Sequence, residues 1–371
     1  MGLTDLVALL SSDAAIQIIA SIVKILIIVV LCLQIPLIMV WAERRAPAMM
    51  QRRKGPNRVG IGKFRLYGLL QSAADAVKLI FKEEVVPTGA NKVVYHIAPI
   101  FSVFTAFLVA CAIPYGNDIT VFGQQISLSP IRLDVGFLFI LAMSSLAVYG
   151  VTLAGWASNN KYSLLGSLRA SAQMISYEIP LGMSLIPLVI IFGTLDLNKM
   201  VIAQSAFPWS WGVVRAPISF FLFFICMFAE TNRSPFDLAE GESELVAGFH
   251  TEYNSAKFAA FFLSEYVAMF VLSALAATVF FGGWQVPFVP YDLLLKIAFG
   301  LDWLAALVGF LFLLLKAGFF MWVYVWVRWT LPRFRYDQLM ALGWKFMLPI
   351  GLFNLLITAL VVTIFDTVTR H

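Results

Sequence analysis

The feature that most constrains this chain is a series of long apolar runs separated by charged loops. Eight runs come near or exceed the roughly 20 residues that an α-helix needs to cross a bilayer core of about 30 Å. They lie near residues 15–42, 94–114, 134–156, 171–192, 217–230, 259–281, 301–327 and 345–365. Charged residues make up only 13% of the 371, against about 25% in soluble domains. We therefore predict an all-α polytopic membrane protein with about eight transmembrane helices, forming a single integral membrane domain over residues 1–371.

The distribution of positive charge predicts how these helices are oriented. Eight spans put both termini on one side, and the four loops on the other side hold most of the 26 lysines and arginines. By the positive-inside rule, those loops face the cytoplasm or matrix and both termini face outwards. The fifth run is short, so it crosses only with help from loop residues or local thinning of the bilayer. No lysine or arginine precedes Lys24, which favours a retained first helix over a cleaved signal peptide.

The first basic loop contains a pattern of a different kind. In residues 64–82, apolar side chains recur at i, i+3, i+4 and i+7, with Asp75 and Lys78 on the opposite face. This spacing predicts an amphipathic interfacial helix. The arginine-rich segment before it contains Pro47 and several later glycines and prolines, which are expected to end the first helix. Such a basic cluster can bind anionic lipid, a soluble partner or the polar head of an amphiphile, although a role as a simple anchor for the loop remains open.

Two glutamates fall inside predicted spans. Glu178 is nine residues past Arg169 and Glu265 is eight past Lys257, so both sit roughly 12–14 Å below the same surface. An ionisable group at that depth costs several kcal/mol unless it is paired, hydrated or protonated, which makes both functional candidates. The alternative is that they are hydrogen-bonded packing contacts between helices. Pro180 frees a backbone acceptor one turn from Glu178, where water can bind.

The third basic loop is an exception to the positive-inside rule, because it holds more acidic than basic residues. Between residues 230 and 257 it holds six acids and only two basic residues, Arg233 and Lys257. The acids are Glu230, Asp237, Glu240, Glu242, Glu244 and Glu252. A solvated acidic loop would explain them, but apolar residues such as Phe236 and Phe249 interleave with the acids. The segment can therefore bury one face while its carboxylates point into a cavity.

The remaining polar groups give weaker signals. Lys316 is the only cation at the middle of a span, and the sequence leaves open whether it pairs with a buried glutamate. The three histidines are scattered and the three cysteines share no ligand spacing, so we predict no metal or iron–sulfur site. His250 is two residues from Glu252 in the sequence, and a minor role in proton movement is open for it. No nucleotide-binding glycine motif is present, and topology accounts for the positive charge without a nucleic-acid partner.

Six motifs together resemble one known family, the H subunits of NADH-quinone oxidoreductase (respiratory complex I), which correspond to the first mitochondrially encoded membrane subunit. They cover all four basic loops and the adjoining helix ends, in the family's order. The motifs are AERRAPAMMQRRKGPNRVG, GLLQSAADAVKLIFKE, RASAQMISYEIPLG, AETNRSPFDLAEGESELVAGFHTEY, SEY and WTLPRFRYDQLM.

The resemblance implies a membrane-arm subunit that meets the hydrophilic arm and forms much of the quinone tunnel. Quinone would be the substrate, and no cofactor would be held by this chain itself. Residues at the quinone path or its charged mouth would be Arg44, Arg45 and Asp75, with Phe236 nearby and Glu240, Glu242 and Glu244 in the acidic loop beside the cavity. Glu178, Glu230 and Glu265 would form a carboxylate chain that relays protons toward the antiporter-like subunits.

The same resemblance implies partners and a location. Hydrophilic-arm subunits would supply the terminal iron–sulfur cluster, and small and antiporter-like membrane subunits and lipid would surround the chain. The bacterial plasma membrane is favoured over the mitochondrial inner membrane. Two other functions remain open: a scaffold subunit of a related membrane-bound hydrogenase or formate hydrogenlyase, or a stand-alone proton-coupled transporter. The latter commonly shows an internal repeat, which we do not find in the sequence.

Overall fold

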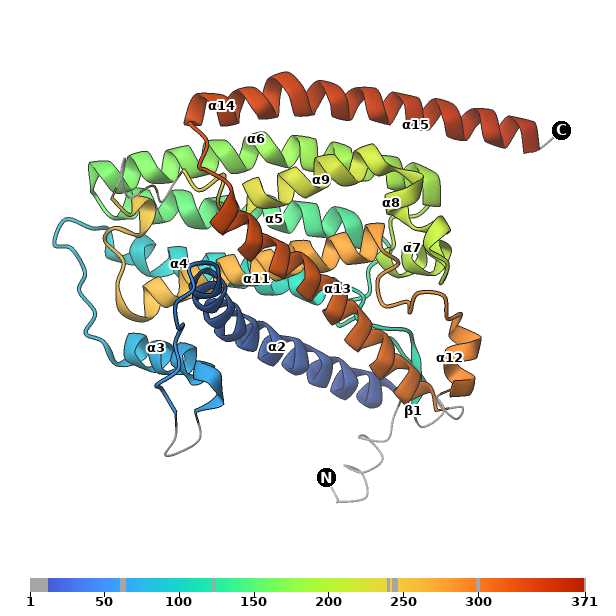
Figure 1. Ribbon diagram of the computed structural model, residues 1–371, viewed down its shortest axis with the longest axis horizontal. Coiled ribbons are helices and arrows are strands. Elements are labelled where there is room, and N and C mark those ends of the chain that lie inside the picture. Colours follow the sequence, from blue (N-terminus) through green and yellow to red (C-terminus); the bar gives the residue numbers. More distant parts are fainter. Residues whose placement is uncertain are drawn as a thin grey trace, which may run out of the picture.

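Long helices make up most of the protein in a computed structural model (Figure 1), which describes residues 13–60, 65–121, 124–238, 241, 246–297 and 301–369. The membrane-length helices are α2 (Asp13–Met50), α4 (Lys92–Cys111), α5 (Gly136–Ala157), α6 (Lys161–Phe192), α11 (Ser255–Phe280), α13 (Asp302–Thr330) and α15 (Leu348–Thr369). Shorter helices are α3 (Leu70–Phe81), α7 (Leu197–Gln204), α8 (Gly212–Arg215), α9 (Pro217–Glu230), α12 (Tyr291–Ile297) and α14 (Tyr336–Ala341).

The remaining regular elements are small. Single helical turns occur at Leu66–Gly68, Pro208–Ser210 and Gly248–His250, and a π-helical turn, Leu342–Met347, joins α14 to α15. A hairpin of β1 (Ile119–Val121) and β2 (Gln124–Ile126) pairs Thr120 with Gln125 in antiparallel register.

The predicted fold class is confirmed. Within the described residues, seven helical stretches are long and apolar enough to cross a membrane, and the shorter apolar helix α9 corresponds to the fifth predicted run. The eight apolar runs thus all coincide with helices, and the one predicted to be short is short. The amphipathic helix predicted over residues 64–82 is present but shorter: α3 begins only at Leu70, because Tyr67 and Gly68 have left-handed φ angles of 53° and 81°. Helix α3 leaves Val77, Ile80 and Phe81 exposed.

Two helices extend well beyond the predicted spans. Helix α2 continues through Pro47 to Met50, so the prediction that Pro47 ends it was wrong; the chain leaves the helix near Arg52, which has a left-handed φ of 53°. Helix α6 begins at Lys161, where the Asn160 side chain accepts a hydrogen bond from Tyr162 N. Hydropathy detects the part of a helix in hydrocarbon, whereas capping groups and backbone conformation decide where it ends.

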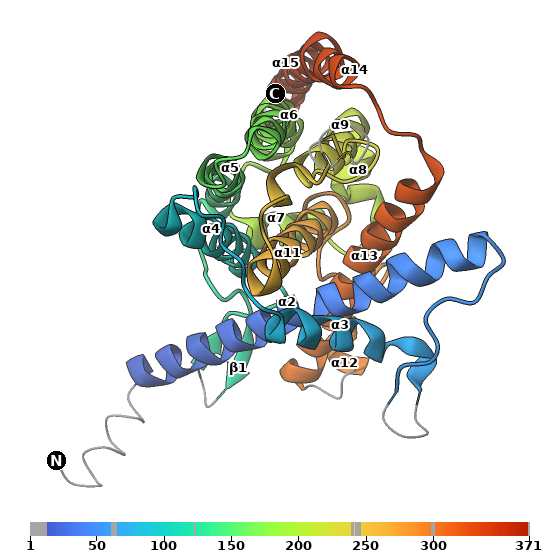
Figure 2. The same cartoon turned by 90° about the vertical axis from the view of Figure 1, so that its left-hand side faces the viewer.

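The long helices form a bundle that Figure 2 shows end-on. Helix α5 packs between α4 and α6, α6 packs against α9, and α11 packs against α4, while α15 lies along α6 (Figure 2). Helices α2 and α13 cross α11 on one side of the bundle. At 1.5 Å per residue the 38 residues of α2 span about 57 Å, so this helix must tilt or project beyond a hydrocarbon core of about 30 Å.

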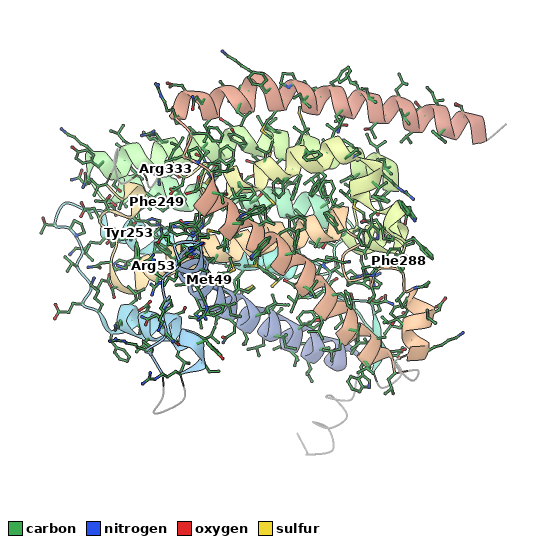
Figure 3. All side chains as sticks on the ribbon, in the orientation of Figure 1. Met49, Arg53, Phe249, Tyr253, Phe288 and Arg333 are labelled. Carbon is green, nitrogen blue, oxygen red and sulfur yellow. The ribbon has the colours of Figure 1, made fainter. Side chains whose placement is uncertain are left out.

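The two ends of the bundle differ in composition. We call the end with α3, the first turns of α6 and α11, and the loops around Arg53 and Arg333 the basic end. The end with the β-hairpin, α7 and α12 is the far end. Figure 3 labels Arg53, Phe249 and Tyr253 toward the basic end and Phe288 toward the far end. A satellite apolar cluster that includes Phe249, Tyr253 and Phe261 packs at the basic end.

Candidate functional site

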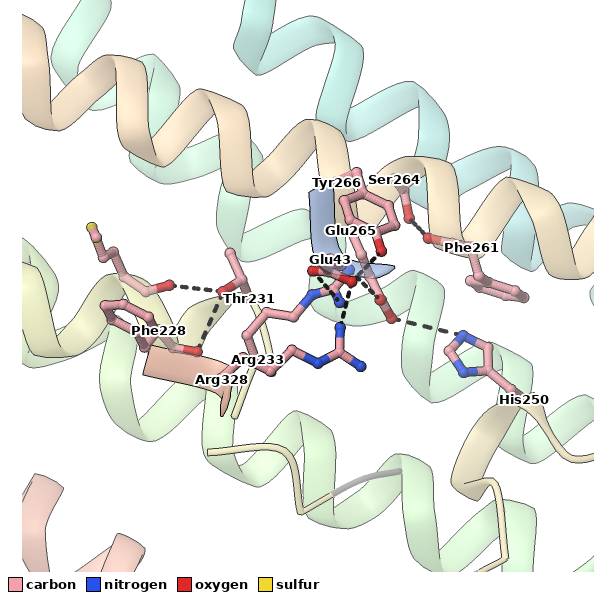
Figure 4. A network of polar contacts seen from close by, with 11 residues as sticks. Glu43, Phe228, Thr231, Arg233, His250, Phe261, Ser264, Glu265, Tyr266 and Arg328 are labelled. Carbon is pink, nitrogen blue, oxygen red and sulfur yellow. Dashed lines mark hydrogen bonds and ion pairs between the residues drawn. The ribbon is translucent and has the colours of Figure 1, made fainter. Parts of the chain in front are cut away.

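A buried network of acids and bases lies near the basic end (Figure 4). At its centre is Glu43 of α2, which is 9% exposed. Its Oε2 accepts hydrogen bonds from Arg328 Nη1 at 2.6 Å and from the Tyr266 hydroxyl at 2.8 Å. Its Oε1 accepts one from Arg233 Nη1 at 3.5 Å. Helices α2, α11 and α13 and the loop after α9 therefore converge on one carboxylate.

Arg233 connects this carboxylate to a second one. Its Nη2 lies 3.5 Å from Glu265 Oε2, and its guanidinium lies over the Tyr266 ring, 4.4 Å from the centroid. On the other side of Glu265, Oε1 lies 3.8 Å from Nε2 of His250. Arg233 and His250 are 7% and 4% exposed, so these contacts form with little access to solvent. Charges removed from water in this way persist only when they are paired, as they are here.

Glu265 also lines a cavity that it shares with Glu230. This cavity has a volume of about 90 Å³ and lies among α4, α5, α6, the end of α9 and α11. Its wall is mostly apolar, with hydroxyl groups from Ser102, Ser144 and Ser264. Because a water needs about 10–15 Å³ of such volume, there is room for several waters between the two carboxylates. Within the described chain, Oε2 of Glu230 is buried and has no hydrogen-bond partner.

Glu178 completes the group of predicted acids. It lies on α6, half-buried, and accepts a hydrogen bond from Ser145 Oγ on α5, next to Ser144 in the cavity wall. It is also within electrostatic range of Glu230. The three acids selected from the sequence, Glu178, Glu230 and Glu265, thus lie around one part of the bundle, although they come from three different helices.

The predicted quinone-side residues form a second, more exposed cluster. Arg44 Nη1 and Asp75 Oδ2 form an ion pair at 2.6 Å, and Gln71 Nε2 donates to the other oxygen of Asp75 at 2.9 Å. Arg45 Nη1 donates to the Tyr67 carbonyl oxygen at 2.9 Å, and its guanidinium lies 5.6 Å from the centroids of Trp41 and Tyr67. These contacts attach the end of α2 to α3.

Phe236 lies apart from this cluster. Its ring is buried and packs against Tyr177 of α6, with 5.7 Å between centroids, and against Phe334 at 5.4 Å. It is therefore on the α6 side of the bundle, whereas Asp75 lies on α3 across it (Figure 2). Glu240, Glu242 and Glu244, predicted to lie in the acidic loop beside the cavity, are outside the described residues.

The buried lysine has a different partner from the one considered. Lys316 Nζ donates to the backbone carbonyl oxygens of Phe281, Gly283 and Gln285 at 2.8, 2.8 and 2.7 Å, just beyond the end of α11. These three acceptors, and not a glutamate, satisfy its ammonium group. Among the residues that the structure describes, no group of three or more His, Cys, Asp or Glu side chains is placed to hold a metal ion.

Sequence reasoning missed Glu43 and Arg328. Both lie just outside the predicted runs 15–42 and 301–327, so they were assigned to loops. The sequence did contain a signal for them: each is a charged residue directly after an apolar run, at a point where the helix continues. Arg233 and His250 lie in an irregular segment, where no periodic pattern indicates which way a side chain points.

Comparisons with known proteins identify close relatives. A family model described as NADH dehydrogenase matches residues 23–359. An H subunit of the NADH-quinone oxidoreductase of Cytophaga hutchinsonii is 45% identical over 326 residues, covering 88% of this chain and 91% of that protein. The relative from Rhodothermus marinus, numbered as the eighth subunit of its enzyme, is 48% identical over 334 residues, with 89% and 93% covered. The H subunit of Bdellovibrio bacteriovorus is 46% identical over 372 residues, with 92% and 95% covered.

Proposed function

Because the chain belongs to the family of H subunits of NADH-quinone oxidoreductase, which are membrane subunits of that enzyme complex, we propose that it forms much of the quinone tunnel and couples quinone reduction to proton translocation. Quinone is the substrate that enters this chain. The observation that carries the proposal is that Arg233 is shared between two carboxylates, the buried Glu43 and the partly buried Glu265. A shared cation responds to a change of charge at either partner.

The quinone approaches at the cluster of α2 and α3. The exposed apolar side chains of Val77, Ile80 and Phe81 suit contact with lipid, from which an oily carrier would arrive. The Arg44–Asp75 pair lies on the adjoining face, 47% and 28% exposed, and offers a donor and an acceptor to a polar headgroup. Arg45, held on the Tyr67 carbonyl, keeps this mouth attached to α2.

Reduction at the headgroup changes the charge near these residues. Two electrons arriving on a quinone require two protons, and these electrons come from the terminal iron–sulfur cluster of the hydrophilic arm. The change in field acts on Glu43, which is adjacent to Arg44 in α2, and through Arg233 on Glu265. Glu265 shares its cavity with Glu230, and Glu230 lies within electrostatic range of Glu178, so the effect continues toward the neighbouring membrane subunits.

The proposed function also implies which molecules surround the chain. Small membrane subunits and antiporter-like subunits would receive the protons, and lipid would cover the remaining apolar faces. The charge distribution and the bacterial relatives support a multi-pass placement in a bacterial plasma membrane, with both termini outside and the basic end facing the cytoplasm.

The test uses Glu178→Gln and Glu265→Gln in the assembled complex, because glutamine keeps the side-chain shape but cannot carry the proton. We expect NADH-driven proton pumping per electron to fall sharply, while NADH oxidation by an artificial acceptor persists. Glu83→Gln, an exposed glutamate beside α3, is the matched control and should leave both activities unchanged. If pumping per electron and quinone reduction are both unaltered in the two variants, the relay role is refuted.

A further inference from the structure

His250 occupies an aromatic enclosure next to the acid network, although the residue pattern alone assigned it no more than a minor role. It ends the helical turn Gly248–His250, between α9 and α11, and is 4% exposed. Its ring lies 3.8 Å from that of Phe249, and 5.4–5.7 Å from the rings of Phe258, Phe261 and Phe262. Phenyl groups accept no proton, so proton exchange takes place on a side of the ring that is open to polar groups.

The backbone around His250 is held tightly against α6. Ser163 Oγ donates to the Phe249 carbonyl oxygen at 3.4 Å, and the His250 carbonyl oxygen accepts from Tyr253 N at 2.9 Å. Gly166 of α6 approaches the turn so closely that a Cβ atom there would lie 2.6 Å from Gly248 Cα. The position of the imidazole is therefore set by two packed elements and does not depend on its own contacts alone.

The ionisable groups on its open side are few within the described chain. Glu265 from α11 faces Nε2 at 3.8 Å, and beyond it Arg233, from the loop after α9, approaches the other carboxylate oxygen at 3.5 Å. Arg233 also contacts Glu43 of α2, at 3.5 Å from its Oε1. Glu252, the neighbour considered from the sequence, instead accepts a hydrogen bond from Asn160 Nδ2 at 2.6 Å. His250 is thus directed at Glu265.

Glu265 consequently lies between two basic side chains of different character, the guanidinium of Arg233 and the imidazole of His250. Arginine stays charged under all physiological conditions, whereas histidine is the side chain that changes charge between about pH 5 and 8. One side of the carboxylate faces a permanent charge and the other faces a group that can gain or lose one. A modest rotation from 3.8 Å brings the two heavy atoms into the roughly 2.6–3.2 Å range in which a proton is transferred.

We propose that His250 and Glu265 form one proton-holding site, in which a single proton is carried on His250 Nε2 or on Glu265 Oε1. The proposal rests on the proposed function and adds a member to its relay. When Arg233 moves toward Glu43, Glu265 loses its permanent counter-charge, and the pair takes up one proton from water in the cavity. When Arg233 returns, the pair releases that proton to the same cavity, on whose wall Glu230 lies.

The first test compares His250→Gln with His96→Gln in the assembled complex, with pumping per electron measured in proteoliposomes at a series of pH values from about 5 to 8. His96 is exposed on α4 and serves as the matched control. We expect His250→Gln to lower pumping per electron and to remove its pH dependence across this window, while artificial-acceptor activity is retained. An unchanged pH profile in His250→Gln would overturn the proposal.

The second test starts with the wild type, whose result does not depend on any variant. In wild-type complex with isotope-labelled imidazole rings, the infrared difference spectrum between oxidised and quinone-reduced states should contain a histidine band. That band should persist in His96→Gln and disappear in His250→Gln. The absence of any imidazole band in the wild type refutes the site, whether or not His250→Gln assembles.

The two proposals can fail separately. If Glu265→Gln stops pumping while His250→Gln behaves as wild type at every pH, the relay stands and the proton-holding pair is wrong. If neither substitution affects pumping, both proposals are refuted. Loss of the pH dependence in His250→Gln together with loss of pumping in Glu265→Gln supports both.

Discussion

Buried charge is accommodated differently at the two ends of this bundle. Toward the far end, the two lysines that lie inside long helices are held by backbone dipoles: Lys316 donates to three carbonyl oxygens, and Lys24 donates to those of Ser127 and Ser129 at 2.9 and 3.3 Å. Near the basic end, acids are held by side chains that they share, as Glu43 and Glu265 share Arg233. A carbonyl dipole is fixed by the fold, whereas a shared guanidinium has two arrangements available.

The difference separates structural charges from functional ones. The carbonyl groups that bind Lys316 carry no ionisable charge. This lysine can therefore hold the end of α11 in place, but its contacts do not change when a carboxylate elsewhere gains or loses a proton. An arginine between two carboxylates is sensitive to the charge of both. Burial alone would have selected Lys316 and Glu265 equally from the sequence; the nature of the partners distinguishes them.

Breaking the shared contact should have the largest effect on stability. Arg233→Met leaves Glu265 without its arginine and Glu43 with one fewer partner, and removing one member of a buried pair costs about 3–5 kcal/mol. We expect a lower midpoint of thermal inactivation and loss of pumping in any complex that assembles. Arg335→Met, at a largely exposed ion pair with Asp337, is the control and should be close to wild type. Equal midpoints for the two variants would argue against a shared, buried Arg233.

Breaking the carbonyl-held contact should have an intermediate effect of a different kind. Lys316→Met leaves three partly buried carbonyl groups without this donor, and an unsatisfied buried group costs up to about 1–3 kcal/mol. Thermal inactivation should occur at lower temperature, while pumping per electron should match wild type in the complex that remains. Lys296→Met, on an exposed face of α12, controls for loss of charge. Reduced pumping per electron in Lys316→Met would show that Lys316 is functional and not only structural, contrary to the difference drawn between the two ends.

The smallest effect on stability is expected at the exposed mouth. Arg44→Ala removes an ion pair whose members are partly exposed, and such pairs contribute about 0–1 kcal/mol. The apparent KM for quinone should nevertheless rise, by up to about tenfold, which corresponds to about 1.4 kcal/mol of binding. Arg53→Ala, at an exposed arginine just past the end of α2, should leave the KM unchanged. A normal KM in Arg44→Ala would remove this pair from the quinone path.

The sequence predicted where the long helices lie, which depends on local hydropathy. It did not predict which way individual polar side chains point. The apolar runs located each of the long helices in the described chain, because a helix that crosses hydrocarbon needs a continuous stretch of apolar residues. Depth along a helix selected Glu178 and Glu265. Glu43 was missed because hydropathy falls before the helix ends, and the orientation of His250 was missed because an irregular loop carries no periodicity. The partners of Lys316 could not be predicted, because they are backbone carbonyl groups, which every residue type has.

Helix α2 joins the two clusters in the simplest way available to a polypeptide. Glu43 and Arg44 are consecutive, and consecutive side chains on an α-helix point about 100° apart, so one faces the bundle while the other faces α3. Lys24, bonded near the hairpin, fixes the distant end of the same helix. Because Glu43 and Arg44 share one stretch of backbone, a displacement of α3 against the end of α2 would move both ion pairs together.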